Sequence, residues 1–135
     1  MASFLRNILG VSKITNASGV DVFKADDSGL QYYTTTDNLT AHAGGGQAAA
    51  TACPSMFNRF TTVATAADSG LLPVSASGMC ITITNAAAAN SMNVFPASGE
   101  AINALAANAA YALAAGKTAE FICCTAGQWH VILSA

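Results

Sequence analysis

The feature that most constrains the fold is the segment 79–133, which reads as short strands separated by turns and is almost free of charge. Its charged residues are Glu100, Lys117 and Glu120. Catalytic and metal sites need several titratable or coordinating groups gathered in one place. Because this segment offers so few, it predicts surfaces that pack against other surfaces rather than a centre for chemistry.

Strand patterns recur along most of the chain. In residues 79–84, MCITIT, the isoleucines fall on one face and the threonines on the other, as in a half-buried strand. Other runs rich in β-branched and aromatic residues, bounded by turn residues, predict further strands. These runs are 20–24, 30–36, 56–64, 71–74, 92–95, 117–125 and 128–133, and residues 68–70 are expected to be a break before 71–74. The first two are expected to form a hairpin, and the whole pattern is that of a β-meander in an all-β fold.

Residues 101–115 allow two interpretations. Alanine is the strongest helix former, and the larger apolar residues of this segment fall at roughly helical spacing. Against a helix, Asn103 and Asn108 interrupt the run and no Glu–Lys pairs support an exposed face. The pattern favours strand–turn–strand, and a helix stays as the alternative.

The length of 135 residues fits a single domain over 1–135, with residues 1–15 as a possible N-terminal arm. Residues 42–52, HAGGGQAAATA, lack a pattern, and their glycine triplet is costly to order. They predict a flexible glycine/alanine loop. The Lys-Ser/Thr pair that completes a phosphate-binding loop does not follow the triplet, so no nucleotide cofactor is expected.

Composition limits the partners. Charged residues make up 9% of the chain, and the apolar excess is mostly alanine, whose small side chain buries little area. We therefore expect part of the stabilisation to come from other copies in a homo-oligomer. The net charge is −2 without a basic stripe, which argues against nucleic acid. No apolar stretch approaches ~20 residues and no signal peptide is recognisable, so neither a membrane span nor export is expected.

The cysteines are expected to be reduced, small buried residues rather than ligands. They are Cys53, Cys80, Cys123 and Cys124, and they lack a C-x-x-C spacing. A zinc site that combines Cys123 or Cys124 with His130 is a remote alternative, because no motif marks its other ligands.

Candidate catalytic residues have simpler structural explanations. Asp37 and His42 lie near each other in sequence, but no G-x-S-x-G motif accompanies them. Glu100 and Glu120 could pair for glycoside cleavage and are instead expected to be solvated surface charges. Trp129 is expected to be a core or interface anchor, with a sugar contact as the alternative. We expect no enzyme, no metal and no cofactor.

Residues 81–132 carry a more specific pattern, with ITITN, MNVFPASGEAIN, ALAAGKTAEF and a closing QWHVI. The spacing that matters is that of Asn85, Pro96, Gly99, Gly116, Phe121 and Trp129. This stretch resembles a module of tailed-bacteriophage capsid decoration, or cement, proteins, and it is also similar to segments of phage fibres and other virion proteins. The resemblance covers about the last 55 residues, and residues 1–75 match nothing recognisable.

The resemblance implies an antiparallel β-sandwich, a jelly roll of about eight strands. It also implies a structural protein on the outer capsid surface of the virion, made in the bacterial host cytoplasm, without catalytic residues. Such a protein binds the phage head and stabilises contacts between major capsid protein subunits, as a homo-oligomer for which a dimer is favoured and a trimer possible. The alternative is a receptor- or glycan-binding module of a phage tail or fibre.

The partner-binding residues expected from the sequence are apolar side chains near the N-terminus, namely Phe4, Leu5, Ile8 and Leu9. They could belong to an arm that adds a strand to the sheet edge of a neighbour. They could equally form an edge strand or a short helix packed on their own domain.

Deletion of residues 2–12 distinguishes these two interpretations. If the segment is an arm, the truncated protein should be lost from capsids, because the arm's backbone hydrogen bonds supply the affinity. Circular dichroism should still show a β fold. Undiminished occupancy of capsids by the truncated protein would contradict the arm.

Overall fold

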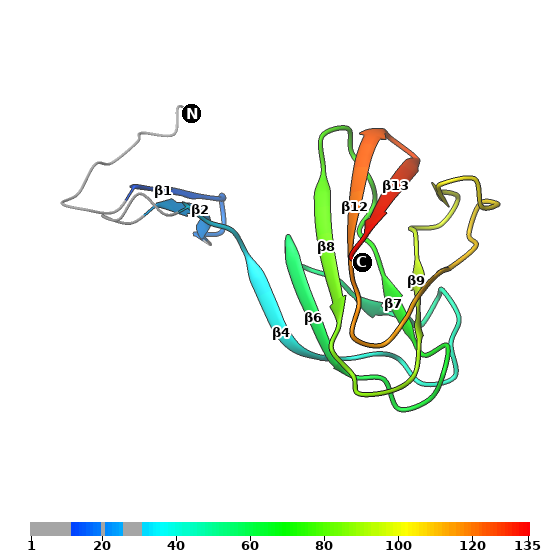
Figure 1. Ribbon diagram of the computed structural model, residues 1–135. Coiled ribbons are helices and arrows are strands. Elements are labelled where there is room, and N and C mark those ends of the chain that lie inside the picture. The colour runs from blue at the N-terminus through cyan, green and yellow to red at the C-terminus, as the bar shows by residue number, and fades with distance from the viewer. Residues whose placement is uncertain (1–11, 20, 26–30) are drawn as a thin grey trace. The chain divides into compact units, whose positions relative to one another are not determined.

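The computed structural model describes residues 12–19, 21–25 and 31–135, and every regular element in these ranges is a β-strand (Figure 1). The all-β class predicted from the sequence is confirmed. The sequence predicts one domain, whereas the chain divides into two compact units, residues 1–35 and 36–135. Among the described residues, the first three strands pair only with one another, which makes the first unit a sheet of its own.

The first unit is a three-stranded antiparallel sheet. Its strands are β1 (Ser12–Thr15), β2 (Asp21–Ala25) and β3 (Gln31–Tyr32), in the order β1-β2-β3. The pairing of β2 with β3 confirms the predicted hairpin. The end of the predicted arm, residues 12–15, is strand β1 and pairs with β2, while residues 1–11 lie outside the described residues.

The second unit contains a six-stranded and a four-stranded sheet. Their orders are β10-β13-β12-β8-β6-β4 and β11-β9-β7-β5. The strands are β4 (Thr35–Thr40), β5 (Thr51–Ala52), β6 (Phe57–Thr62), β7 (Ser69–Leu71), β8 (Cys80–Asn85), β9 (Met92–Phe95), β10 (Ala101–Ile102), β11 (Tyr111–Leu113), β12 (Thr118–Thr125) and β13 (Gln128–Leu133).

From β4 to β9 the chain alternates between the two sheets and winds as a β-solenoid (Figure 1). Strands β4, β6 and β8 lie in the six-stranded sheet, and β5, β7 and β9 lie in the four-stranded sheet. Neighbours are parallel where β6 meets β8 and where β7 lies between β5 and β9. Strands β11, β12 and β13 then add antiparallel pairs, and the short β10 is parallel to β13.

The predicted antiparallel sandwich is therefore confirmed only in part. A β-meander requires each strand to turn back onto its predecessor, and in the second unit only the β12–β13 pair does so. The connections from β4 to β9 cross to the opposite sheet, so a strand meets one that lies two places away along the chain. Such crossovers bring strands together in parallel, which the jelly-roll prediction did not include.

Proline marks the corners at which the chain leaves the four-stranded sheet. These prolines are Pro54 after β5, Pro73 after β7 and Pro96 after β9. Backbone bonds stack the corners, since Cys53 N donates to Leu71 O and Leu72 N donates to Phe95 O, both at 2.9 Å. Proline has no N–H to continue a ladder, so the strand ends there and the chain turns towards the other sheet.

The hydrophobic core lies between the two sheets of the second unit. The six-stranded sheet contributes the fully buried Phe60, Phe121 and Trp129, and the four-stranded sheet contributes Met92. The ring of Tyr111 meets that of Phe121 edge to face, with 5.9 Å between centroids. Aromatic and aliphatic side chains from the two sheets thus fill the space between them.

The two sheets approach closely at Gly70. The sequence places a break at residues 68–70, but Ser69 and Gly70 belong to β7. A Cβ at Gly70 would lie 2.9 Å from Phe60 Cζ and 3.0 Å from Met92 Cε. Glycine is present in this strand because the core leaves no room for a side chain.

The predicted loop at 42–52 follows a defined path and ends in a strand, because Thr51–Ala52 is β5. Its three glycines all have positive φ, a conformation that glycine adopts without steric strain. His42 exchanges two backbone hydrogen bonds of 2.9 Å with Ser69, and Gln47 Nε2 donates to Pro96 O at 2.7 Å. These bonds attach the loop to β7 and to the last proline corner.

Residues 101–115 form strand–turn–strand, as the pattern favoured, with β10 and β11 at the two ends. Asn103 and Asn108 have φ of 51° and 66°, a left-handed conformation that asparagine tolerates. Their side-chain oxygens accept from Val131 N at 3.0 Å and Gly99 N at 2.7 Å, respectively. The asparagines that interrupt the helical pattern are thus the residues that build the turns.

The substitution Gly70→Ala should lower the free energy of unfolding by about 1–3 kcal/mol, because the new methyl group displaces Phe60 and Met92 in a packed core. Urea unfolding followed by circular dichroism measures the change. Adding Phe60→Leu, which frees space beside residue 70, should make the combined loss smaller than the sum of the two single losses. An unchanged urea midpoint for Gly70→Ala alone would contradict this prediction, because it would show that Phe60 and Met92 can move aside without loss of stability.

Candidate docking surface

The described residues contain no cluster of three or more His, Cys, Asp or Glu side chains that could hold a metal ion. All four cysteines are free; Cys53 and Cys123 are buried as predicted, whereas Cys124 is exposed, contrary to the prediction. Burial raises the pKa of Cys53 to about 12. Burial, with a hydrogen bond to Glu120, raises the pKa of Cys80 to about 11. Such thiols stay protonated near neutral pH and are poor nucleophiles.

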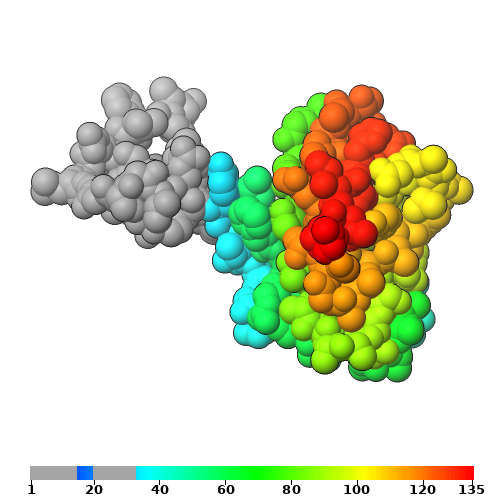
Figure 2. All heavy atoms as spheres, in the orientation of Figure 1, coloured from blue at the N-terminus to red at the C-terminus, as the bar shows by residue number. Residues whose placement is uncertain are grey.

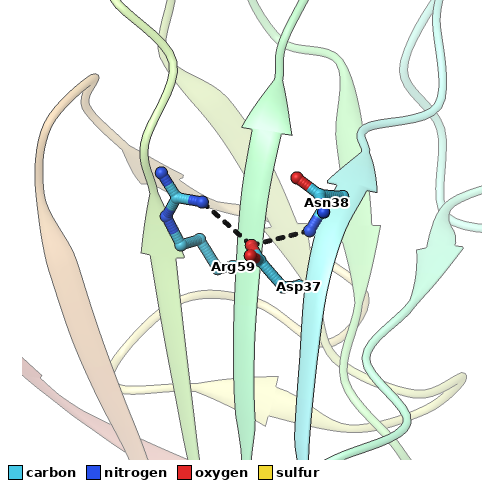
Figure 3. Close-up of polar contacts among 3 residues, drawn as sticks. All are labelled: Asp37, Asn38 and Arg59. Atoms are coloured by element: carbon cyan, nitrogen blue, oxygen red, sulfur yellow. Dashed lines mark hydrogen bonds and ion pairs between the residues drawn. The ribbon is translucent and has the colours of Figure 1, made fainter.

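Asp37 and His42 have separate partners. Asp37 Oδ1 accepts from Arg59 Nη1 at 2.9 Å and from the backbone N–H of Asn38 at 2.7 Å (Figure 3). The side-chain bond from Arg59, followed by the bond from Asn38, lowers the pKa of Asp37 below its usual value. His42 is joined to Ser69 through its backbone. The two residues therefore do not make the base–orienter pair that their sequence proximity suggests.

Glu100 is buried, with 8% exposure, so the prediction of a solvated surface charge is wrong for this residue. Its Oε1 accepts from the N–H and the hydroxyl of Ser75 at 2.8 and 2.9 Å, and its Oε2 accepts from the indole N–H of Trp129 at 3.0 Å. Ser75 Oγ in turn accepts from Gly127 N at 2.7 Å. Trp129 is fully buried, which confirms its core role and removes it as a sugar-stacking surface.

The outward side of β6, β8, β12 and β13 forms a continuous strand surface, here named the outer face. Side chains alternate between core and surface along these strands, and the register aligns the outward ones in rows. The outward residues are Phe57, Arg59, Cys80, Thr82, Thr84, Thr118, Glu120, Ile122, His130 and Ile132. Figure 2 shows β12 and β13, in orange and red, side by side at the surface of the second unit.

The charged groups of the outer face already have partners within the chain. Arg59 is paired with Asp37, and Glu120 Oε1 accepts from Cys80 Sγ at 2.9 Å. The neighbouring hydroxyls of Thr84 and Thr118 bond to each other at 3.0 Å. The outer face therefore presents few groups that would select a strongly charged partner.

Two large apolar side chains stand at opposite ends of one row on the outer face. The row runs from Phe57 through Thr82 and Glu120 to Ile132. With strands ~4.8 Å apart, its ends are separated by roughly 14 Å. Ile132 is 59% exposed and Phe57 is 39% exposed. Single exposed apolar residues are ordinary, but this row gives the outer face two apolar contacts on a rigid base.

A second apolar surface follows the proline corners and is here named the corner groove. It consists of two open depressions of about 380 and 410 Å³ that share Cys53, Pro54 and Pro73. Val74, which is 76% exposed, lines one of them. The residues that line the corner groove carry no formal charge.

The partner-binding residues predicted from the sequence, Phe4, Leu5, Ile8 and Leu9, lie outside the described residues. No family model, curated protein or solved structure matches this chain. Within the described ranges, no helix has the length and apolar character needed to cross a bilayer.

Sequence reasoning missed both surfaces, although a local signal existed for each. The outward positions of the outer face follow from the alternation in MCITIT and TAEFIC. The corner groove follows from a proline that recurs after a short strand in TACPS, GLLPV and NVFPA. The burial of Glu100 had no local signal, because its donors Ser75 and Trp129 are distant in sequence.

Asp68 is a second buried carboxylate, located just before β7. The hydroxyl of Thr65 donates to it at 2.7 Å, and the N–H of Thr65 donates at 2.9 Å. Gly44 N donates from the glycine loop at 3.3 Å. The Thr65 side-chain bond, followed by its backbone bond, lowers the pKa of Asp68 below its usual value.

This lowered pKa predicts a loss of stability in acid. The contribution of Asp68 is present above the unfolded pKa of about 4 and disappears as the pH falls through the lower folded pKa. Asp68→Asn should be less stable than wild type at pH 7 and should lose less stability between pH 7 and acid, as measured by urea unfolding across pH. Asp37→Asn removes an exposed carboxylate and should change the profile much less. Parallel pH profiles for wild type and Asp68→Asn would contradict the assignment.

Proposed function

We propose that this chain is a structural virion protein of a tailed bacteriophage that binds the outer surface of the head and stabilises contacts between major capsid protein subunits. The outer face is the observation that carries the proposal. It combines exposed apolar side chains, Ile132 and Phe57, with an Arg59 guanidinium paired to Asp37 and a Glu120 carboxylate hydrogen-bonded to Cys80. A surface of this kind binds mainly through burial of apolar area and shape, which suits a lasting contact in an assembly.

The resemblance of residues 81–132 to decoration proteins also supports the proposal. The residues that carry it have framework roles in this chain. Asn85, Pro96, Phe121 and Trp129 are buried, and Gly99 and Gly116 have positive φ. Two sheets packed over one core are likewise the frame of the sandwich that the resemblance implies. The resemblance thus concerns the scaffold, and the contacts with the head belong to the surface.

The physical effect on the head follows from linkage. A protein that binds across a joint between capsid subunits only in the assembled geometry stabilises that geometry by mass action. A homo-oligomer, with a dimer favoured, strengthens this effect because the first contact raises the effective concentration for the second. The outer face of each copy would then rest on a different capsid subunit.

A receptor- or glycan-binding role in a tail or fibre has less support. The aromatic residue best suited to stack on a sugar is Trp129, and it is inside the core with its N–H bonded to Glu100. The carboxylates of Asp37, Glu100 and Glu120 likewise accept hydrogen bonds within the chain, so each has a structural role.

The substitution Ile132→Glu tests the outer face. A carboxylate buried in an apolar contact would weaken binding to heads purified without the protein by at least about tenfold. Co-sedimentation of the protein with such heads measures the affinity. Val74→Glu places the same charge on an exposed valine in the corner groove and should bind as the wild type does.

Each result of this comparison has a distinct meaning. Wild-type affinity for Ile132→Glu would exclude the outer face, and a loss for Val74→Glu alone would move the contact to the corner groove. Heads that carry the wild-type protein should also rupture at a higher temperature than bare heads. Failure of the wild-type protein to bind heads would contradict the proposed function itself.

A further inference from the structure

The six-stranded sheet ends at β4 among the described residues, and β4 is the longest edge strand of the second unit. The other edges are β5 and β10, with two residues each, and β11, with three. A long edge strand exposes unpaired N–H and C=O groups to which another strand can add. Strand β4 is therefore the place at which the sheet of one copy could join the sheet of a second copy.

The middle of β4 departs from an extended strand. Asn38 has φ of 58°, in the left-handed region, although it lies between strand residues on both sides. The burial pattern shows the same irregularity, since Asp37 and Asn38 are both exposed where strict alternation would bury one of them. A partner strand in regular register would lose its match with β4 at this point.

The side chains around Asn38 hold this irregularity in place. Asp37 Oδ1 accepts the backbone N–H of Asn38 at 2.7 Å, so that this donor is already used within the chain (Figure 3). The same oxygen accepts from Arg59 Nη1 on β6 at 2.9 Å. Asp37 is thus anchored to the neighbouring strand by its ion pair with Arg59.

We propose that the Asp37–Asn38 break prevents β4 from pairing with β4 of a second copy, and so limits growth of the six-stranded sheet. Without the break, two copies could pair their β4 strands antiparallel about a two-fold axis, which makes the same edge complementary to itself. The proposal concerns the edge of the sheet and does not depend on the proposed binding of the outer face to a phage head.

The test uses the full chain with Asp37→Thr and Asn38→Val together. These residues favour extended backbone and remove the carboxylate that binds the Asn38 N–H. Sedimentation velocity over a range of concentrations should show an apparent mass that rises at least about twofold above that of the wild type. A variant that is folded by circular dichroism and keeps the wild-type mass at every concentration would overturn the proposal.

Three further variants keep the result interpretable. Asn38→Gly retains the left-handed conformation and should keep the wild-type mass. A rise in the apparent mass of this variant would contradict the proposal. Asp37→Thr with Asn38→Thr replaces the first variant if that one fails to fold, and the same rise in mass is expected. Adding Thr35→Lys and Thr40→Lys to the associating variant places charges along the same edge and should restore the wild-type mass. Association that survives these lysines does not run through β4 and would also overturn the proposal.

Discussion

The buried carboxylate of Glu100 is the contact on which the closing part of the fold depends. A carboxylate taken out of water is costly unless its oxygens are satisfied, and here Ser75 and the indole of Trp129 donate to both of them. Through these bonds Glu100, which directly precedes β10, joins the segment after β7 to the final hairpin. The last strands are thereby fixed against the β-solenoid formed by β4 to β9. Trp129 can fill the core because its indole N–H has a hydrogen-bond acceptor.

The β-solenoid arrangement determines which side chains are exposed on the surface and can bind a partner. Because the chain crosses between sheets from β4 to β9, one side of every strand faces the core and the other side faces outward. The core side is filled by aromatic and aliphatic residues, and the outward side of β6, β8, β12 and β13 becomes the outer face. The same geometry leaves β4 as an edge, where the Asp37–Asn38 break interrupts the strand. The outer face and the exposed edge strand β4 therefore both result from the way the chain alternates between the two sheets.

Strand positions could be read from the sequence because they depend on local alternation. The predicted 92–95 and 128–133 coincide with β9 and β13, and 79–84 differs from β8 by one residue at each end. Strand partners could not be read, because parallel or antiparallel pairing depends on whether a connection crosses to the other sheet. Gly70 was predicted to lie in a break, although it belongs to β7. A glycine is needed there because Phe60 of the other sheet approaches it closely, and a contact between sheets leaves no signal in the local sequence. The outward positions of the outer face could have been predicted from the alternation of residues, whereas the burial of Glu100 could not.

The chain has a single tryptophan, and it lies in the core beside Glu100 rather than on a surface. Its fluorescence therefore reports whether the final hairpin is docked on the rest of the second unit. A partner that rests on the outer face would touch Ile132 and Phe57 and leave the environment of the indole as it was. Intrinsic emission can thus follow folding while a separate label follows assembly, so the two processes can be timed independently in one sample.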